Sequence, residues 1–224
     1  MPRVTAAHRE RQTHRILQAA EECFARSGFQ AASMDEVIAT AGMSSSTVYR
    51  YFPEGKRSLI RAVLTRRMGP LVERIKRIAE SEEPLDFERD FIEALTLLNY
   101  QRHGAEADSG ADRQDGALEA PDDVGLSSWA PLAYHAWGEL TRDPEMSVLV
   151  QASYRDIHGA LARLCRNGQR VGTISGRLSP EQLASLIQSV CFGLIVEQLI
   201  TGRADVEGAA STLRQLLAPE GTRS

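Results

Sequence analysis

The 224-residue sequence has little lysine and little cysteine. Only two of its 26 basic residues are lysines, Lys56 and Lys76. Its three cysteines, Cys23, Cys165 and Cys191, are odd in number, widely spaced and without a CxxC pair. This pattern excludes a disulfide framework and a zinc knuckle. We expect the thiols to be small buried apolar side chains rather than redox sensors, and we predict no metal site and no cofactor.

The sequence also lacks a long apolar run. Its most apolar stretch, residues 189–196, is far shorter than the ~20 residues that a bilayer-spanning helix needs, and polar or charged residues flank it. The N-terminus has no apolar run behind Arg3, so we expect no secretory signal. We therefore predict a soluble, cytoplasmic protein with no membrane partner.

The motifs that carry most enzyme chemistry are absent as well. The sequence contains no Ser-His-Asp order, no paired-carboxylate spacing, no glycine-rich phosphate loop and no HExxH. We predict that the chain is not an enzyme and has no catalytic residues.

What the sequence does have is helical periodicity along almost its whole length, with no alternating strand pattern. Glycine and proline divide it into roughly nine segments, which predicts an all-α protein of about nine helices. Ser179 and Pro180 form a strong helix start, and the pair Gly69-Pro70 is expected to kink its helix. The expected helices span residues 7–27, 34–41, 45–51, 56–80, 86–102, 127–141, 144–167, 180–201 and 205–217.

The net charge of −4 is unevenly distributed. Residues 1–79 hold 14 basic and 7 acidic side chains, whereas residues 80–224 hold 12 basic and 23 acidic ones. Residues 104–125 contain seven acids and one arginine and almost no large apolar side chain, so we interpret them as a mobile loop. A basic module is thus joined to an acidic body, and this separation favours nucleic-acid binding by the N-terminal part.

Residues 33–52 contain the parts of a helix-turn-helix, whose second helix enters the major groove of DNA. Ser33 and Glu36 have the spacing of a capping box, and Gly42 stands at the turn, where a positive φ is expected. Hydroxyls and one guanidinium stay exposed on the second helix, and these groups suit phosphate oxygens and guanine. We predict that DNA is bound by these side chains and by the lysine of the next helix: Ser33, Ser44, Ser45, Ser46, Thr47, Tyr49, Arg50, Tyr51 and Lys56.

Some of these residues have a second interpretation. Ser44 is first of all an N-cap for the helix that follows it. Tyr49 and Tyr51 also suit the core of a three-helix domain, and the residues alone leave this alternative open.

An ordered set of residues over about positions 9–64 resembles the N-terminal domain of the tetracycline-repressor (TetR) family of transcriptional regulators. The set consists of Arg15, Ile16, Leu17, Ala19, Ala20, Phe24, Gly28, Phe29, Val37, Ile38, Ala41, Gly42, Met43, Ser44, Thr47, Val48, Tyr49, Arg50, Tyr51, Phe52, Lys56 and Leu59. The resemblance implies an all-helical homodimer on a palindromic operator, with a C-terminal domain that carries an inducer pocket and the dimer interface. It also favours a phosphate contact for Tyr49.

The expected domains follow from this reading. Residues 1–55 are expected to form the helix-turn-helix DNA-binding domain, and a long helix over residues 56–80 connects it to the rest. Residues 81–224, including the mobile loop 104–125, are expected to form the larger ligand-binding and dimerisation domain.

Aromatic side chains cluster in the segments of the second domain, which is typical of a largely apolar ligand pocket, although they also suit an ordinary core. The predicted pocket residues are Phe91, Tyr100, Trp129, Tyr134, Trp137, Tyr154, His158 and Phe192. The helix at 180–201 is apolar on more than one side, and the last helix repeats the apolar spacing, which favours a four-helix dimer interface over the covering of a monomeric core. The predicted interface residues are Leu186, Ser189, Val190, Gly193, Leu194, Leu213 and Leu217.

The sequence therefore predicts a ligand-responsive, dimeric DNA-binding transcriptional regulator. Its partners would be double-stranded operator DNA, a second copy of the chain and a largely apolar small molecule, and binding of that molecule would release a repressor from a palindromic operator. The alternative is a constitutive DNA-binding regulator, or an activator, without a small-molecule inducer.

Overall fold

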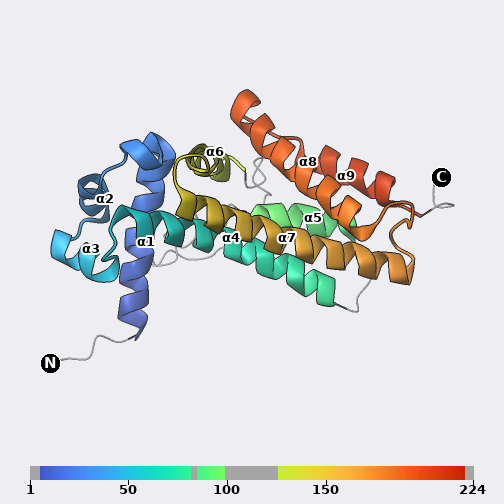
Figure 1. Cartoon of the computed structure of the whole chain (residues 1–224), viewed down its shortest axis with the longest axis horizontal. Helices are drawn as coiled ribbons and strands as arrows, with labels where there is room; N and C mark the ends of the chain where they lie inside the picture. The colour runs from blue at the N-terminus through green and yellow to red at the C-terminus, as the bar shows by residue number, and fades with distance from the viewer. Residues whose placement is uncertain (1–5, 82–84, 99–125, 220–224) are drawn as a thin grey trace, which may run out of the picture. The chain divides into compact units, whose positions relative to one another are not determined.

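The computed structural model describes residues 6–81, 85–98 and 126–219. These residues form nine α-helices and no strand, which confirms the all-α prediction. The predicted loop 104–125 and Tyr100 lie outside the described residues. The helices are α1 (Ala6–Ala31), α2 (Met34–Ala41), α3 (Ser45–Tyr51), α4 (Lys56–Glu80), α5 (Phe87–Thr96), α6 (Trp129–Glu139), α7 (Pro144–Val171), α8 (Pro180–Thr201) and α9 (Val206–Leu217) (Figure 1).

The chain divides into two compact units. Residues 1–68 and 131–151 make up the first, and residues 69–130 and 152–224 make up the second. Three helices, α4, α6 and α7, contribute residues to both units. The predicted domain boundaries at residues 55 and 80 stay predictions.

In the first unit α2 packs against α1, and α3 follows directly after a short turn (Figure 1). The core is built from apolar side chains at helical spacing, and Ile16, Val37 and Val48 are fully buried. Phe24 and Phe29 meet edge to face with ring centroids 5.2 Å apart. This core fixes the three helices relative to one another, which a DNA-reading helix requires.

Helix α1 does not end at Ser27 as predicted but resumes after Gly28 and reaches Ala31. Gly28 has φ 78° and ψ 166°, a conformation that is essentially restricted to glycine, so the helix turns there without stopping. A Cβ at this position would lie 2.9 Å from the His135 ring of α6. The glycine therefore serves both the bend and the close approach of α6.

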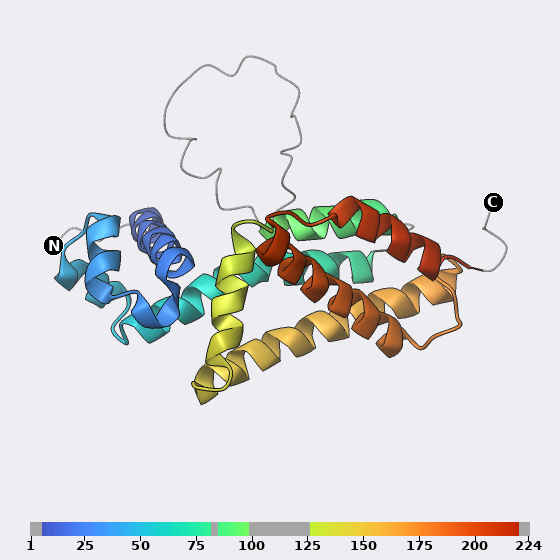
Figure 2. The same cartoon turned by 90° about the horizontal axis from the view of Figure 1, so that it is seen from above.

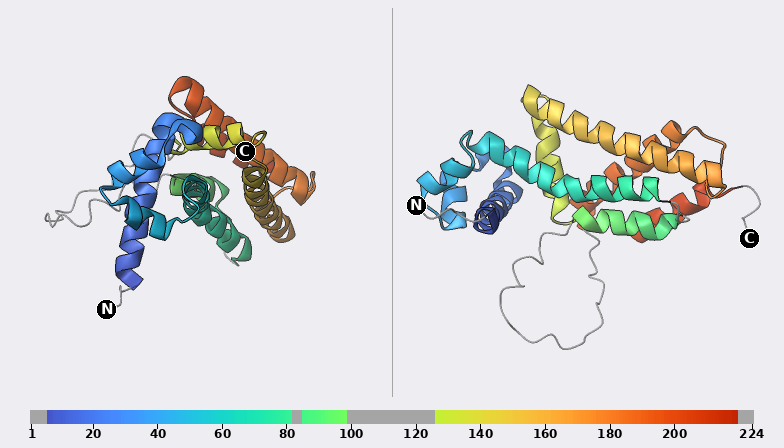
Figure 3. Two further views of the ribbon diagram at one scale, coloured as in Figure 1. Left: turned by 60° about the vertical axis from the view of Figure 1, so that its left-hand side comes forward. Right: turned by 90° about the horizontal axis from the view of Figure 1, so that it is seen from below.

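In the second unit α5 lies alongside the C-terminal half of α4 and packs against α9 (Figures 2 and 3). Helix α4 continues through Pro70 as one helix of 25 residues, so the proline does not end it. Helix α8 begins with Ser179 as N-cap and Pro180 at its first position, as predicted. Gly202, which has φ 80°, ends the helix.

The prediction that the apolar stretches are too short to span a bilayer is wrong for α8. Helix α8 has 22 residues and, among the described helices, is the one long and apolar enough to cross a bilayer. Residues 189–196 are only the most apolar part of this helix, and further apolar residues lie on either side of them. The same length and composition occur in core helices of water-soluble proteins, so this helix is weak evidence for a membrane span.

Candidate DNA-binding surface

The start of α2 is fixed by the predicted capping box. The Ser33 hydroxyl accepts a hydrogen bond of 3.1 Å from the Glu36 amide, and the Ser33 amide donates one of 2.8 Å to Oε2 of Glu36. The Ser33 hydroxyl also lies 3.2 Å from Oε2 of Glu36, to which it donates, and the bonds from the Ser33 amide and hydroxyl hold the pKa of the Glu36 carboxyl below its usual range. Ser33 is exposed, so its predicted DNA contact adds to a structural role.

The turn between α2 and α3 is centred on Gly42, which has φ 60°. Its amide donates to the carbonyl of Ala39 at 3.0 Å, and the Met43 amide donates to the carbonyl of Ile38 at 3.3 Å. These two bonds satisfy carbonyls at the end of α2 that would otherwise lack a partner. Arg15 of α1 reaches the Gly42 carbonyl with Nη2 at 3.5 Å, which ties the turn to the first helix.

Helix α3 presents one apolar and one polar face. Val48 is fully buried, whereas Ser45, Ser46, Tyr49 and Arg50 are exposed. The structure thus brings these predicted DNA-binding side chains together on one surface. A face of hydroxyls, a phenol and a guanidinium offers donors for phosphate oxygens and for base edges.

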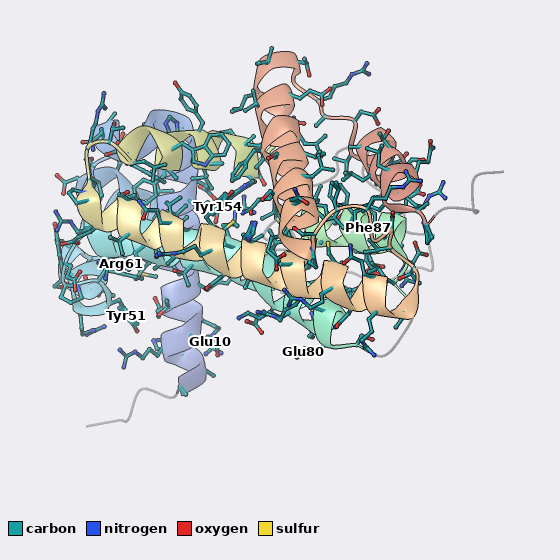
Figure 4. The ribbon with its side chains drawn as sticks, turned by 45° about the vertical axis from the view of Figure 1, so that its right-hand side comes forward. Glu10, Tyr51, Arg61, Glu80, Phe87 and Tyr154 are labelled. Carbon is teal, nitrogen blue, oxygen red and sulfur yellow. The ribbon has the colours of Figure 1, made fainter. Side chains whose placement is uncertain are left out.

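The structure shows where the residues with two interpretations lie. The Ser44 hydroxyl accepts a hydrogen bond of 3.3 Å from the Thr47 amide and lies 2.8 Å from Oγ1 of Thr47, so Ser44 caps α3. Tyr49 is 43% exposed, which removes it from the core, whereas Tyr51 is half-buried. The guanidinium of Arg50 lies over the Tyr51 ring, 5.6 Å from its centroid. The Tyr51 ring thus holds the Arg50 guanidinium in place through a cation–π contact. Tyr51 is labelled in Figure 4.

Lys56 has partners that sequence reasoning missed. Its Nζ donates to the carbonyls of Gln30 at 2.9 Å and Ala32 at 3.1 Å. An ammonium group at the C-terminal end of a helix is favourable because the last carbonyls there lack intrahelical donors. The ammonium has three N–H groups, and these two bonds hold it at the end of α1.

Two further contacts join α4 to α1. Nη2 of Arg66 lies 2.8 Å from Nε2 of His14, and Nε of Arg67 lies 2.9 Å from Oε1 of Glu21. Burial raises the pKa of Glu21 and lowers that of Arg67, while the opposite charge of each partner acts against this shift. The Arg67 side chain is almost wholly buried, so this ion pair lies inside the first unit.

The predicted ligand-pocket residues differ in their burial and in their neighbours. Tyr154, His158 and Phe192 form a stack on α7 and α8, with ring centroids 6.3 Å apart for Tyr154 and His158 and 6.0 Å apart for Tyr154 and Phe192. Phe91 and Trp129 are buried. Of the other described pocket residues, Tyr134 is 60% exposed and Trp137 is half-buried.

The predicted interface residues divide into two groups. Leu186, Ser189 and Gly193 are exposed on α8, and Val190 is half-buried. Leu194, Leu213 and Leu217 are only 5%, 2% and 3% exposed, because the chain's own core covers them and leaves little surface for a partner. The predicted interface residues leave out other apolar residues of α8 and α9 that remain exposed: Val196, Leu199, Ile200 and Leu216.

Two short capped helices around a glycine turn, with the polar face of the second exposed, define a helix-turn-helix DNA-binding protein. Two sequence models support a more specific assignment. The one described as "Bacterial regulatory proteins, tetR family" matches residues 16–63, and the one described as "BetI-type transcriptional repressor, C-terminal" matches residues 118–220. The chain belongs to the TetR family of transcriptional regulators.

Known proteins are similar over most of the chain. The transcriptional regulator UidR of Escherichia coli K12 is 23% identical over 186 residues, which cover 82% of this chain and 79% of UidR. The solved SmeT–triclosan complex has a TM-score of 0.68 at 17% identity and covers 94% of this chain and 93% of its own. A regulator from Saccharomonospora viridis in complex with choline has a TM-score of 0.64 at 21% identity, covering 92% and 95%.

Proposed function

We propose that the chain is a homodimeric repressor that binds a palindromic operator and leaves it when a small molecule binds. The observation that carries the DNA-binding part is the exposed polar face of α3, held by the caps at Ser33 and Ser44 and by the turn at Gly42. A rigid support of this kind is needed before a few side chains can discriminate between bases. The family and its named relatives, which are transcriptional regulators, support the same reading.

The proposed DNA contacts are those predicted from the sequence, with Ser44 and Tyr51 included. Ser45, Ser46, Thr47 and Arg50 are expected to read bases or bind phosphates from the face of α3, and Tyr49 is expected to contact phosphate. Ser33 and Lys56 would contact the backbone on either side of the groove. Their structural bonds hold them in fixed positions, which supports a phosphate-binding role because the entropy lost on binding is small.

The outward face of α8 supports the dimer. Leu186, Val196, Leu199 and Ile200 are exposed apolar residues of one helix, and Ile200 is 77% exposed. Exposed apolar residues of this density on one helix are typical of a protein interface. Two recognition helices about 34 Å apart then contact successive major grooves.

A ligand response is supported by the structural neighbours, two of which are described as complexes with triclosan and with choline. A ligand that favours one spacing of the recognition helices shifts the population away from the DNA-binding form. We place the protein in the cytoplasm, where operator DNA is accessible. A constitutive regulator or an activator is the alternative, and it would show no ligand-dependent loss of DNA binding.

The test is a gel-shift titration against DNA from upstream of the gene itself, with unrelated DNA of equal length as the second probe. We expect the upstream probe to bind more tightly, and we expect Arg50→Ala to reduce this preference. Arg170→Ala, which removes an exposed arginine of α7, is the matched control and should leave the preference unchanged. Equal affinity for all probes would overturn sequence-specific regulation.

A further inference from the structure

The second unit contains a cavity of about 250 Å³ where the end of α4 meets the start of α5. It is partly open to solvent. Figure 4 labels Glu80 and Phe87, the last residue of α4 and the first of α5. The lining is mixed, with three guanidinium groups, one carboxylate, one hydroxyl and two apolar side chains: Arg74, Arg77, Arg89, Asp90, Ser81, Ile78 and Leu85.

The buried Asp90 carboxylate binds two of the three arginines, Arg74 and Arg89. Oδ1 of Asp90 accepts hydrogen bonds from Nη2 of Arg74 at 3.1 Å and from Nη2 of Arg89 at 3.5 Å. The Asp90 side chain is only 9% exposed, so it has little freedom, and Arg74 also bonds to Glu93 of α5. Guanidinium groups from two helices are therefore held at one wall before any ligand arrives.

The third arginine is unpaired within the described part of the chain. Arg77 is exposed in the last turn of α4 and has no ion-pair or hydrogen-bond partner among the residues that the structure describes. Among the described residues that line the cavity, three are arginines and one is a carboxylate, and Glu93 beside them pairs with Arg74 and Arg89 but not with Arg77. A guanidinium group has five N–H donors, and the bonds of Arg74 and Arg89 use only part of theirs.

We propose that this cavity binds a small organic anion, a carboxylate with a compact apolar body. Guanidinium groups bind carboxylates with paired, charge-assisted hydrogen bonds, and Arg77 together with Arg74 or Arg89 supplies them. Ile78 and Leu85 receive the apolar body. This ligand carries a negative charge, whereas the aromatic residues predict only that the ligand is largely apolar. Its role as the inducer rests on the proposed function, but its binding does not.

The test is calorimetric titration of the full chain with cyclohexanecarboxylate and with its neutral isostere cyclohexanecarboxamide. We expect saturable binding of the carboxylate and about tenfold weaker binding of the amide, because only the carboxylate forms charge-assisted bonds. Inorganic phosphate should also bind more weakly, because it has no apolar body. Equal affinity for the amide, or no saturable binding of the carboxylate, would overturn the proposal, and phosphate bound as tightly as the carboxylate would overturn its apolar part.

Variants locate the site. Arg77→Gln should weaken carboxylate binding about tenfold without lowering the melting temperature, because Arg77 has no partner in the described chain. Arg170→Gln, an exposed arginine of α7, is the matched control and should not change binding. Unchanged binding in Arg77→Gln places the anion elsewhere and sinks the proposal. Gel shifts with the same anion separate the proposed anion site from the proposed ligand-released repressor. If the carboxylate binds but leaves the affinity for operator DNA unchanged, the anion site stands and only its role as the inducer site is removed.

Discussion

Gln30 and Glu139 are 109 positions apart in the sequence, and Nε2 of Gln30 donates a hydrogen bond of 2.6 Å to Oε2 of Glu139. The carbonyl of the same Gln30 accepts a bond from Nζ of Lys56. One residue near the end of α1 therefore joins α1 to both α4 and α6 within the first unit. Glu139 is only 7% exposed, so its carboxylate depends on this amide for a partner.

Replacing Gln30 tests this relationship. We expect Gln30→Ala to lower the free energy of unfolding by about 1–3 kcal/mol, because a buried acceptor loses its donor. Glu139→Gln should destabilise less, since its amide oxygen still accepts from Gln30. Urea unfolding followed by circular dichroism measures both. An unfolding midpoint of Gln30→Ala equal to that of the unmodified protein would show that water replaces the amide without loss.

Gly28 and Gly42, two of the glycines with positive φ in the first unit, should respond differently to substitution. Gly42→Ala places a Cβ 2.7 Å from Nη2 of Arg15, a flexible side-chain end that moves easily, so the left-handed backbone dominates and we expect a loss of about 1–2 kcal/mol. Gly28→Ala should be worse, because its φ and ψ suit only glycine and the His135 ring lies 2.9 Å from the new Cβ.

Thermal and urea unfolding of the two variants provide the comparison. The double variant Gly28→Ala, His135→Ala separates the causes, since it removes the ring but keeps the backbone strain. We expect it to recover only part of the loss. Full recovery would mean that the backbone at residue 28 carries no strain.

The salt dependence of DNA binding should identify the role of Lys56. Two of its N–H groups are used by the carbonyls of Gln30 and Ala32, and the third is available for a phosphate. We expect Lys56→Gln to lower the slope of log K against log salt by about one and to weaken all DNA probes alike. A loss of stability with an unchanged slope would instead show that Lys56 only holds the end of α1.

Protonation of His14 should destabilise the first unit. A guanidinium only donates, so Nε2 of His14 accepts the 2.8 Å bond from Arg66, and this requires a neutral ring. Burial, together with the charge of Arg66, lowers the pKa of His14 from 6.5. The unfolded chain therefore binds a proton first as the pH falls, and stability decreases below pH 6.5.

Unfolding curves measured on both sides of this pH test the sign. His14→Gln keeps an acceptor but cannot titrate, so we expect its stability to change less with pH in this range. An identical slope in the variant and the unmodified protein would assign the pH dependence to other groups.

Local signals predicted the fold well, and tertiary contacts account for most of what they missed. Ser33, Gly42 and Ser179 carry their structural meaning in a few neighbouring residues, and the caps and the turn are found where the sequence places them. The continuation of α1 past Gly28 depends on the backbone bend beside His135 of α6, which is more than 100 positions away. No local pattern contains that contact.

In the candidate sites, too, local sequence predicts some features and tertiary contacts determine the others. The exposed face of α3 follows from helical spacing, because a short helix that buries only Val48 leaves the side chains opposite it exposed. The pairing of Arg74 with Asp90 requires two helices to lie side by side, and the bonds of Lys56 require the end of α1 to approach α4. Leu213 and Leu217 fit the predicted interface pattern equally well, but both side chains are buried in the core of the second unit.

The chemistry of the cysteines has a practical consequence. Burial raises the pKa of Cys165 and of Cys191 to about 12, and Cys23 is fully buried. Thiols that stay protonated or enclosed react slowly with maleimides and other thiol-directed labels. A cysteine introduced on the exposed face of α3, as in Ser46→Cys, would then be labelled selectively in the natural background. Spin labels at that position in two copies would report the separation of their recognition helices directly.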